Sequence, residues 1–346
     1  YFKEEAIDFA WEFLTGEDHC ALPAERLWAS VHRDDDEAYA LWRDHIGMPE
    51  ERILRLGDKD NFWSMGDTGA CGPCAEIHWD KGPEHGNDPE ERLLEIWNLV
   101  FMQYDRDEGG RLNPLPSPSI DTGMGLERIA SVMQGVASNY DTDLLRAVIA
   151  AGEGVAGHTY GSGGERDLAL RVIADHSRAT AFLVADGILP GNEGREYVLR
   201  RIMRRAIRFG ARVGIDDVFF HKTCLAVCDL MEADYPELTD ARVLIERAVP
   251  SEEELFRSTL DRGLALIDKW SDAQAPGSEM PGEVAFRLHD TYGFPPDLTQ
   301  LIGEEKGFAV DMAGFAAALE VQREMARAAR KARQGSAGEA SPVPEG

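Results

Sequence analysis

The sequence predicts an α+β protein in which a strand-rich part, residues 1–150, precedes a helical part, residues 151–332. Runs of β-branched and aromatic residues are confined to the first part. From about residue 141 onward, apolar residues recur at helical spacing almost without interruption. The Gly-rich stretch 152–165 lies where the two patterns meet. A Gly-, Ser- and Pro-containing tail, 333–346, is expected to be a disordered linker.

The first half of the strand-rich part contains four expected elements. Apolar residues Ile7, Trp11 and Leu14 share one helical stripe and predict a helix over 4–14. Asp34 to Asp36 are N-cap candidates for the next helix. The remaining elements are a strand at 27–31, that capped helix at 37–45, and a short strand at 53–56.

The second half predicts a hairpin that leads into a helix. Residues 92–104 are rich in β-branched and aromatic side chains and run into the turn sequence DRDEGG, 105–110. The returning segment carries Pro114, Pro116 and Pro118, which predict an irregular extended segment or an edge strand. Residues 119–130 then read as a strand that passes through two glycines into a helix.

Composition restricts the class of protein. The chain has 346 residues, 43% of them hydrophobic, and 36 Lys and Arg against 63 Asp and Glu give a net charge of −27. We expect a globular, cytoplasmic protein, because no apolar run is long enough for a membrane span and the start lacks signal-peptide layout. The five cysteines are an odd number, which favours free thiols over a disulfide framework. The absence of an initial Met suggests a piece of a longer polypeptide.

Residues 119–130, SIDTGMGLERIA, carry the first candidate chemistry. Gly123 and Gly125 allow a ligand to approach the backbone. Arg128 suits a phosphate or a stacked purine, and Asp121 suits an ammonium group. A strand-to-helix turn with a surface arginine remains the alternative for this segment on its own.

Five segments in order carry a family resemblance. Residues 60–80, 95–104 and 119–130, followed by 172–208 and 287–299, resemble the class II aminoacyl-tRNA synthetase core of the alanyl-tRNA synthetase family, with DTGMGLERI matching motif 3 of that class. The resemblance implies a partial class II antiparallel sheet with flanking helices, followed by an all-helical domain that recognises the tRNA acceptor stem. It also implies alanine–tRNA ligase activity in protein biosynthesis, with alanine, ATP and tRNA(Ala) as substrates.

The resemblance also assigns roles to residues. Arg128 would hold ATP beside Gly125, and Asp121 would bind the α-ammonium group of alanine. Trp63, Val100 and Gly123 would line a pocket for one methyl group, with Asn98 near the substrate. Packing alone excludes a competing amino acid by only about 1–3 kcal/mol, so such an enzyme needs editing, and we expect no editing domain within this chain.

Metal binding has weaker sequence support. Glu76 and Glu95 are candidate ligands for the Mg²⁺ that accompanies ATP, the alternative being solvated strand carboxylates. Cys71-Gly-Pro-Cys74 is expected to form a structural turn under the substrate, because no second ligand pair accompanies it; zinc is therefore not expected. Cys224 and Cys228, one helical turn apart, are expected in the core.

The segment 191–214 is a candidate RNA-binding helix. It contains seven arginines against two glutamates in an otherwise acidic chain, and guanidinium groups match phosphate oxygens. These arginines are Arg195, Arg200, Arg201, Arg204, Arg205, Arg208 and Arg212, of which 195, 201, 204, 205 and 208 are the predicted tRNA contacts. The alternative is an arginine-rich helix paired internally with acidic neighbours.

By resemblance, Asn192 and Asp297 match the family's pair that reads a G·U wobble in the acceptor stem, although each could instead be a helix N-cap. Motif 1 and the motif 2 arginine would lie before residue 1, so we expect this chain alone to be inactive or very weak. A non-catalytic tRNA-binding paralogue and a ligase that charges a carrier protein are the competing interpretations. The sequence does not indicate an oligomeric state.

Overall fold

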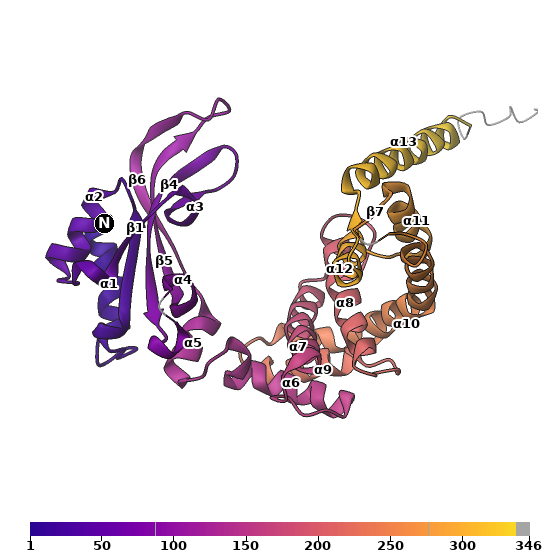
Figure 1. The fold of residues 1–346 in the computed structure, drawn as a ribbon, viewed down its shortest axis with the longest axis horizontal. Coiled ribbons are helices and arrows are strands. Elements are labelled where there is room, and N and C mark those ends of the chain that lie inside the picture. Colours follow the sequence, from indigo (N-terminus) through magenta and orange to yellow (C-terminus); the bar gives the residue numbers. More distant parts are fainter. Residues whose placement is uncertain (87, 276, 337–346) are drawn as a thin grey trace, which may run out of the picture. The chain divides into compact units, whose positions relative to one another are not determined.

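The computed structural model describes residues 1–86, 88–275 and 277–336, with the side chains of 90 and 326–336 left aside, and its residues form two compact units (Figure 1). The first unit is Tyr1–Arg146 and the second begins at Ala147. The strands are β1 Leu27–His32, β2 Ile53–Leu56, β3 Phe62–Ser64, β4 Gly69–Asp80, β5 Leu93–Arg106, β6 Leu112–Met124, β7 Glu279–Met280 and β8 Ala309–Val310. The helices are α1 Lys3–Thr15, α2 Asp36–Ala40, α3 Asp58–Asn61, α4 Pro89–Arg92, α5 Leu126–Gln134, α6 Asp143–Ala156, α7 Gly164–Ala185, α8 Gly194–Arg212, α9 Phe220–Met231, α10 Glu237–Ser271, α11 Gly282–Tyr292, α12 Pro296–Lys306 and α13 Met312–Ser336.

The first unit is built on a six-stranded sheet. The strand order is β2-β1-β4-β5-β6, with β3 pairing β4. Its pairs are antiparallel except for β1 and β2, which run parallel, so the expected antiparallel sheet is in fact mixed. The proline-bearing segment is the edge strand β6, as one of the two expectations for it stated.

One face of this sheet carries the core of the first unit. Ile7 and Leu14 of α1 are fully buried and cluster with Ala29 and Ile77 of the sheet, and α1 and α2 lie against this face (Figure 1). The expected helix over 37–45 is a short α-helix followed by a π-helical turn at Leu41–His45. The wider turn accompanies complete burial of Trp42 in the same core.

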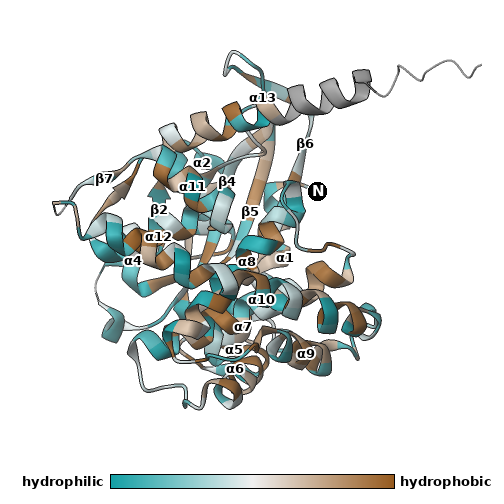
Figure 2. Ribbon diagram, turned by 90° about the vertical axis from the view of Figure 1, so that its right-hand side faces the viewer, coloured by the Kyte–Doolittle hydropathy of each residue, from teal (hydrophilic) through white to brown (hydrophobic). Residues whose placement is uncertain are grey.

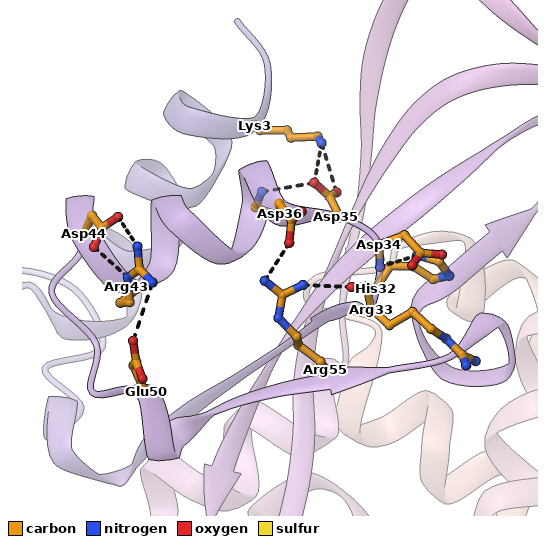
Figure 3. A network of polar contacts seen from close by, with 11 residues as sticks. Lys3, His32, Arg33, Asp34, Asp35, Asp36, Arg43, Asp44, Glu50 and Arg55 are labelled. Atoms are coloured by element: carbon orange, nitrogen blue, oxygen red, sulfur yellow. Dashed lines mark hydrogen bonds and ion pairs between the residues drawn. The ribbon is translucent and has the colours of Figure 1, made fainter.

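A buried ion pair ties α1 to the beginning of α2 (Figure 3). Lys3 Nζ lies 2.8 Å from Asp35 Oδ1, and both side chains are almost completely buried. Asp35 also accepts the backbone N–H of Ala38 at 3.0 Å, so it is the N-cap that the aspartate run predicted. Arg55 on β2 reaches Asp36 at 2.8 Å and closes the same corner.

The second unit is largely helical, and apolar and polar residues are interspersed along its helices (Figure 2). The expectation of an all-helical domain is wrong in one detail, since β7 and β8 form a parallel pair. Cys224 and Cys228 are fully buried on α9, as expected for core packing. α13 continues to Ser336, and the rest of the predicted tail, 337–346, lies outside the described residues. Among the described residues, none of the helices could cross a bilayer.

The longest helix, α10, buries one continuous stripe. Seven of its buried positions follow helical spacing, and Glu253 is buried beside them: the seven are Ile245, Val249, Glu252, Phe256, Leu260, Gly263 and Ile267. One member of this apolar stripe is a glutamate. A charged group at such a position needs a partner in the interior.

Candidate functional site

Strand register places the predicted small-molecule residues on one face of the sheet. Glu76 on β4 pairs with Asn98 on β5, which pairs with Gly123 on β6. The neighbouring row joins Val100 on β5 to Asp121 on β6. Because directly paired residues point to the same side of a sheet, all five share one face, opposite the α1 side.

Trp63 joins the same face from β3. It pairs with Gly72, which precedes Cys74 by two residues on β4, and Cys74 pairs with Val100. Gly72 is required there because a Cβ would lie 2.0 Å from the carbonyl oxygen of Phe101. The close approach of the strands thus brings Trp63 toward the rows that carry the predicted pocket.

A β-bulge adds Glu95 to this face. The β4–β5 register shifts between Ile77 and His78, so that Asn98 pairs with Glu76 while Glu95 pairs with His78. Without the extra residue in β5, positions 95 and 98 would point to opposite faces. The bulge therefore allows both side chains to face the same ligand.

Arg128 is held at the edge of this face by Glu95. Its Nη1 donates to Glu95 Oε2 at 3.0 Å and to the Glu95 carbonyl oxygen at 2.9 Å. Gly125, the residue before α5, leaves room for this side chain, since a Cβ there would lie 3.1 Å from Arg128 Cδ. Both ion-pair partners are about two-fifths exposed, so an incoming anion can reach the guanidinium.

Three features of the face are suited to binding a ligand. Among the described residues, Asn98 Oδ1 is buried without a hydrogen-bond partner. Burying such an acceptor costs free energy unless a donor forms a hydrogen bond to it. Asp121 is exposed. A Cβ built on Gly123 meets nothing within 4 Å. An acceptor, a carboxylate and an empty space thus adjoin one another on β5 and β6.

A polar network that the sequence did not reveal supports Glu76. Ser30 on β1 donates to Glu76 Oε2 at 3.1 Å and receives Asn61 Nδ2 at 3.0 Å, and His78 Nε2 lies 3.1 Å from the same hydroxyl. The side chain of Glu76 is 12% exposed, so the alternative of a solvated strand carboxylate is wrong for this residue. Isolated Ser and Asn residues carry no motif, and only the strand pairing brings them together.

The expected turn at Cys71–Cys74 is wrong. These residues lie within strand β4, at a register shift, and both thiols are buried. Burial raises the pKa of Cys74 to about 12, with the carboxylate of Glu76 adding to the effect. Cys74 is therefore a neutral thiol at physiological pH. Within the part of the chain that the structure describes, no group of three His, Cys, Asp or Glu side chains could hold a metal ion.

The arginine-rich segment is α8, and much of its charge points inward. Arg204 is 4% exposed and its Nη2 lies 2.6 Å from Glu252 Oε1 on α10. Arg208 is 5% exposed and pairs with Glu305 at 2.7 Å. We predicted both as tRNA contacts, but in this structure they are interior ion-pair partners, as the alternative interpretation stated. Burial lowers the pKa of Arg204, while Glu252 opposes that shift.

Asn192 and Asp297 each contact an arginine of α8, Arg200 and Arg201 respectively. Arg200 Nη1 donates to Asn192 Oδ1, and Arg201 Nη2 lies 3.1 Å from Asp297 Oδ2. Neither residue is an N-cap, because Glu193 precedes α8 and Pro295 precedes α12, so that alternative is wrong. Asp297 also lines a surface cavity of about 210 Å³ together with Arg201 and the exposed Arg205. Arg195, at the start of α8, is exposed as well.

Sequence reasoning missed Glu252 altogether. The signal was present, because Glu252 falls at helical spacing between the apolar Val249 and Phe256. A glutamate in such a stripe predicts a buried cationic partner. The run Ser251 to Glu254 instead resembles a solvated helix face.

Comparison with known proteins identifies the family. A family model described as tRNA synthetases class II (A) matches residues 1–343. An alanine–tRNA ligase of Nitratidesulfovibrio vulgaris, strain Hildenborough, is 56% identical over 341 residues, which cover 96% of this chain and 39% of that protein. An alanine–tRNA ligase of Acidithiobacillus ferridurans is 53% identical over 330 residues, covering 93% of this chain and 37% of that protein. The chain thus spans about two-fifths of the length of these relatives.

Proposed function

Since the chain belongs to the family of class II tRNA synthetases (A), we propose that it forms the alanine-activating sheet and the acceptor-stem-reading unit of an alanine–tRNA ligase of the cytoplasm. The observation that carries this proposal is the row of Asn98, Val100, Asp121 and Gly123 on one sheet face, with Arg128 at its edge. A protein that only bound tRNA would have no use for such a pocket.

In the first step, the carboxylate oxygen of alanine attacks the α-phosphorus of ATP, and pyrophosphate leaves. No protein nucleophile takes part, so the chain contributes positioning and charge. Asp121 is exposed and pairs with the alanine ammonium group, while Asn98 Oδ1, buried without a partner in the described structure, accepts a second N–H from it. The open space at Gly123 receives the methyl group, bounded by Val100 and Trp63.

Arg128 is paired with the Glu95 carboxylate before ATP binds and pairs with a phosphate of ATP afterwards. Its contact with the Glu95 carboxylate, at 3.0 Å, keeps the guanidinium on the sheet face before the nucleotide arrives. A phosphate then shares or replaces that contact. Glu95 and Glu76, two carboxylates on the same face, would hold hydrated Mg²⁺, which supplies neutralising charge to the phosphates.

In the second step, a ribose hydroxyl of the tRNA 3′ end attacks the adenylate carbonyl, and AMP leaves. Asn192 and Asp297 read the wobble pair of the acceptor stem, with short polar side chains that suit the shallow minor groove and its edges. The exposed Arg195 and Arg205 provide phosphate contacts, with Arg201 beside Asp297. Arg204 and Arg208 have no part in RNA contact because they are buried.

The test is alanine-dependent ATP–pyrophosphate exchange. It is measured on this chain, on a version extended upstream through motif 2, and on each with Asp121→Ala. Activity only in the extended form with Asp121 intact supports the proposal. Exchange by this chain alone would contradict the expected need for motif 2. Absence of exchange in both forms, with tRNA binding retained, would favour the non-catalytic paralogue.

A further inference from the structure

A single buried carboxylate connects both halves of the proposed wobble-reading pair. Glu252 on α10 is 5% exposed. Its Oε1 accepts from Arg204 Nε at 2.7 Å, and its Oε2 lies 3.2 Å from Arg200 Nε. The two arginines lie one turn apart on α8, so the carboxylate bridges them from the facing helix.

Each arginine reaches a different loop with its remaining donors. Arg200 Nη1 donates to Asn192 Oδ1 in the loop before α8. Arg204 Nη1 donates to the carbonyl oxygen of Gly293, the residue that ends α11 and begins the loop leading to Asp297. Gly293 has φ +63, and a Cβ there would lie 2.4 Å from Arg204 Nη1, so the loop is shaped around this arginine.

The bond to Arg200 also determines which way the Asn192 amide faces. With Oδ1 accepting from Arg200, the NH₂ group of Asn192 is the end left to donate to RNA. Asp297, in turn, has one oxygen on Arg201 and one buried oxygen, Oδ1, with no hydrogen-bond partner among the described residues. The pair thus holds an amide donor and an unpartnered carboxylate oxygen in set orientations.

We propose that Glu252 is a positioning residue for acceptor-stem recognition: through Arg200 and Arg204 it sets in place Asn192 and the loop that leads to Asp297 in the first turn of α12. The proposal rests on the proposed function, since it assumes that Asn192 and Asp297 read the RNA. Its physical basis is the cost of an uncompensated buried charge. Without the Glu252 carboxylate, Arg204 must move toward water and releases the Gly293 carbonyl, while Arg200 loses the group that orients it.

The neighbouring Glu253 provides a matched control. It is fully buried on the same helix, but its carboxylate accepts the backbone N–H groups of Phe219 and Phe220 and pairs with Arg257 at 2.9 Å. It therefore supports the start of α9, and within the described part of the chain it makes no hydrogen bond or ion pair with Arg200 or Arg204. Glu252 and Glu253 are thus adjacent buried glutamates with different partners.

The experiment compares Glu252→Gln with Glu253→Gln in the full-length protein that contains this chain. The readouts are kcat/KM for tRNA(Ala) carrying G·U or G·C at the recognition pair, alanine-dependent pyrophosphate exchange, and the unfolding temperature. For Glu252→Gln we expect the preference for G·U to fall at least tenfold while exchange stays within twofold. Glu253→Gln is expected to lower the unfolding temperature and to keep the preference. A Glu252→Gln enzyme that keeps its preference within twofold would overturn the proposal.

Two further variants separate the possible causes. The double variant Arg204→Met with Glu252→Met replaces the ion pair by apolar side chains, which restores packing without buried charge. If the double variant unfolds at a higher temperature than Glu252→Gln but still lacks the preference for G·U, the positioning role of Glu252 is supported. If the preference for G·U returns together with stability, the positioning role is refuted. Asp297→Ala tests the underlying function. If Asp297→Ala keeps the preference, the reading role of Asp297 fails, whereas a loss in Asp297→Ala but not in Glu252→Gln refutes only the role of Glu252.

Discussion

The two units position their candidate residues by different means. In the first unit, hydrogen-bonded strand register sets Asn98, Asp121 and Gly123 side by side. In the second unit, Arg200 of α8 donates to Asn192 and Arg201 pairs with Asp297, while ion pairs join α8 to Glu252 of α10. The backbone determines the first arrangement, and charge determines the second.

This difference predicts how each site responds to substitution. A side chain can be removed from the sheet face without moving its neighbours, because the main chain holds their positions. Removal of one charge from the α8 network leaves another charge unpaired, so the effect spreads to residues that the substitution did not touch. Substitutions in the sheet should therefore act singly, and those in the network should act together.

The largest expected effect is at Arg128, which in the proposed mechanism supplies positive charge to the phosphates of ATP. Arg128→Met should reduce alanine-dependent exchange of the upstream-extended protein by about a hundredfold or more, as for loss of one transition-state donor. Its side chain is about two-fifths exposed and its ion pair with Glu95 is open to solvent, so the unfolding temperature should change little. Arg111→Met, at the exposed hairpin turn, is the control. A decrease in exchange of less than fivefold would show that Arg128 does not contact the reacting phosphates.

Substitutions at two glycines of the sheet unit should separate an effect on stability from an effect on alanine binding. A Cβ at Gly72 would lie 2.0 Å from the Phe101 carbonyl oxygen, whereas one at Gly123 meets nothing within 4 Å. Gly72→Ala should lower the free energy of unfolding by about 3 kcal/mol through overpacking. Gly123→Ala should leave it unchanged and raise KM for alanine, because the added methyl group fills the proposed pocket. An unchanged KM for alanine would remove Gly123 from that pocket.

In the charge network, Arg205 and Arg208 should behave as opposites. Arg208 is buried against Glu305, and Arg205 is exposed. Arg208→Met should cost about 2 kcal/mol of stability through loss of a charged hydrogen bond, with no change in the salt dependence of tRNA binding. Arg205→Met should leave stability alone and reduce the slope of log K against log salt by about 1. Equal slopes for both variants would place Arg205 outside the RNA interface.

The smallest expected effect comes from an ion pair at the edge of the sheet unit. The Arg92 guanidinium, with the N–H of Gly82, holds the pKa of Asp80 below its usual value against the opposing effect of burial. Because the folded-state pKa is depressed, this stabilisation is complete above about pH 4 and is lost as pH falls through the lower folded value. Asp80→Asn should remove about 1 kcal/mol at neutral pH and flatten stability against pH below 4. The exposed Asp44 pairs with Arg43 in solvent, so its substitution should give a smaller change. Exchange activity should survive both substitutions.

The sequence predicted local elements well and tertiary partners poorly. The short strand at 53–56 has the bounds expected, and residues 119–130 do pass from strand to helix, since periodicity and glycine position report local structure directly. The mixed sheet and the bulge that turns Glu95 toward Asn98 depend on pairing between strands. Periodicity does not report such pairing.

The charged interior shows the same limit more sharply. Arg204 meets Glu252 across 48 residues and Arg208 meets Glu305 across 97. Helical spacing placed these arginines on one side of α8, but it contains no information on what faces that side. The charge count alone favoured an RNA-binding helix, whereas Arg204 and Arg208 are buried in ion pairs within the second unit.

The prolines of β6 have a consequence for the behaviour of the protein in solution. Pro114, Pro116 and Pro118 are exposed at alternate positions of an edge strand and carry no N–H group. An edge with its outward donors removed cannot template a strand from another molecule along that stretch. The fourteen-residue strand β5, which is rich in aromatic and β-branched residues, already pairs with β4 on one side and with β6 on the other. The prolines therefore protect the outer edge of β6 itself from edge-to-edge aggregation along this stretch.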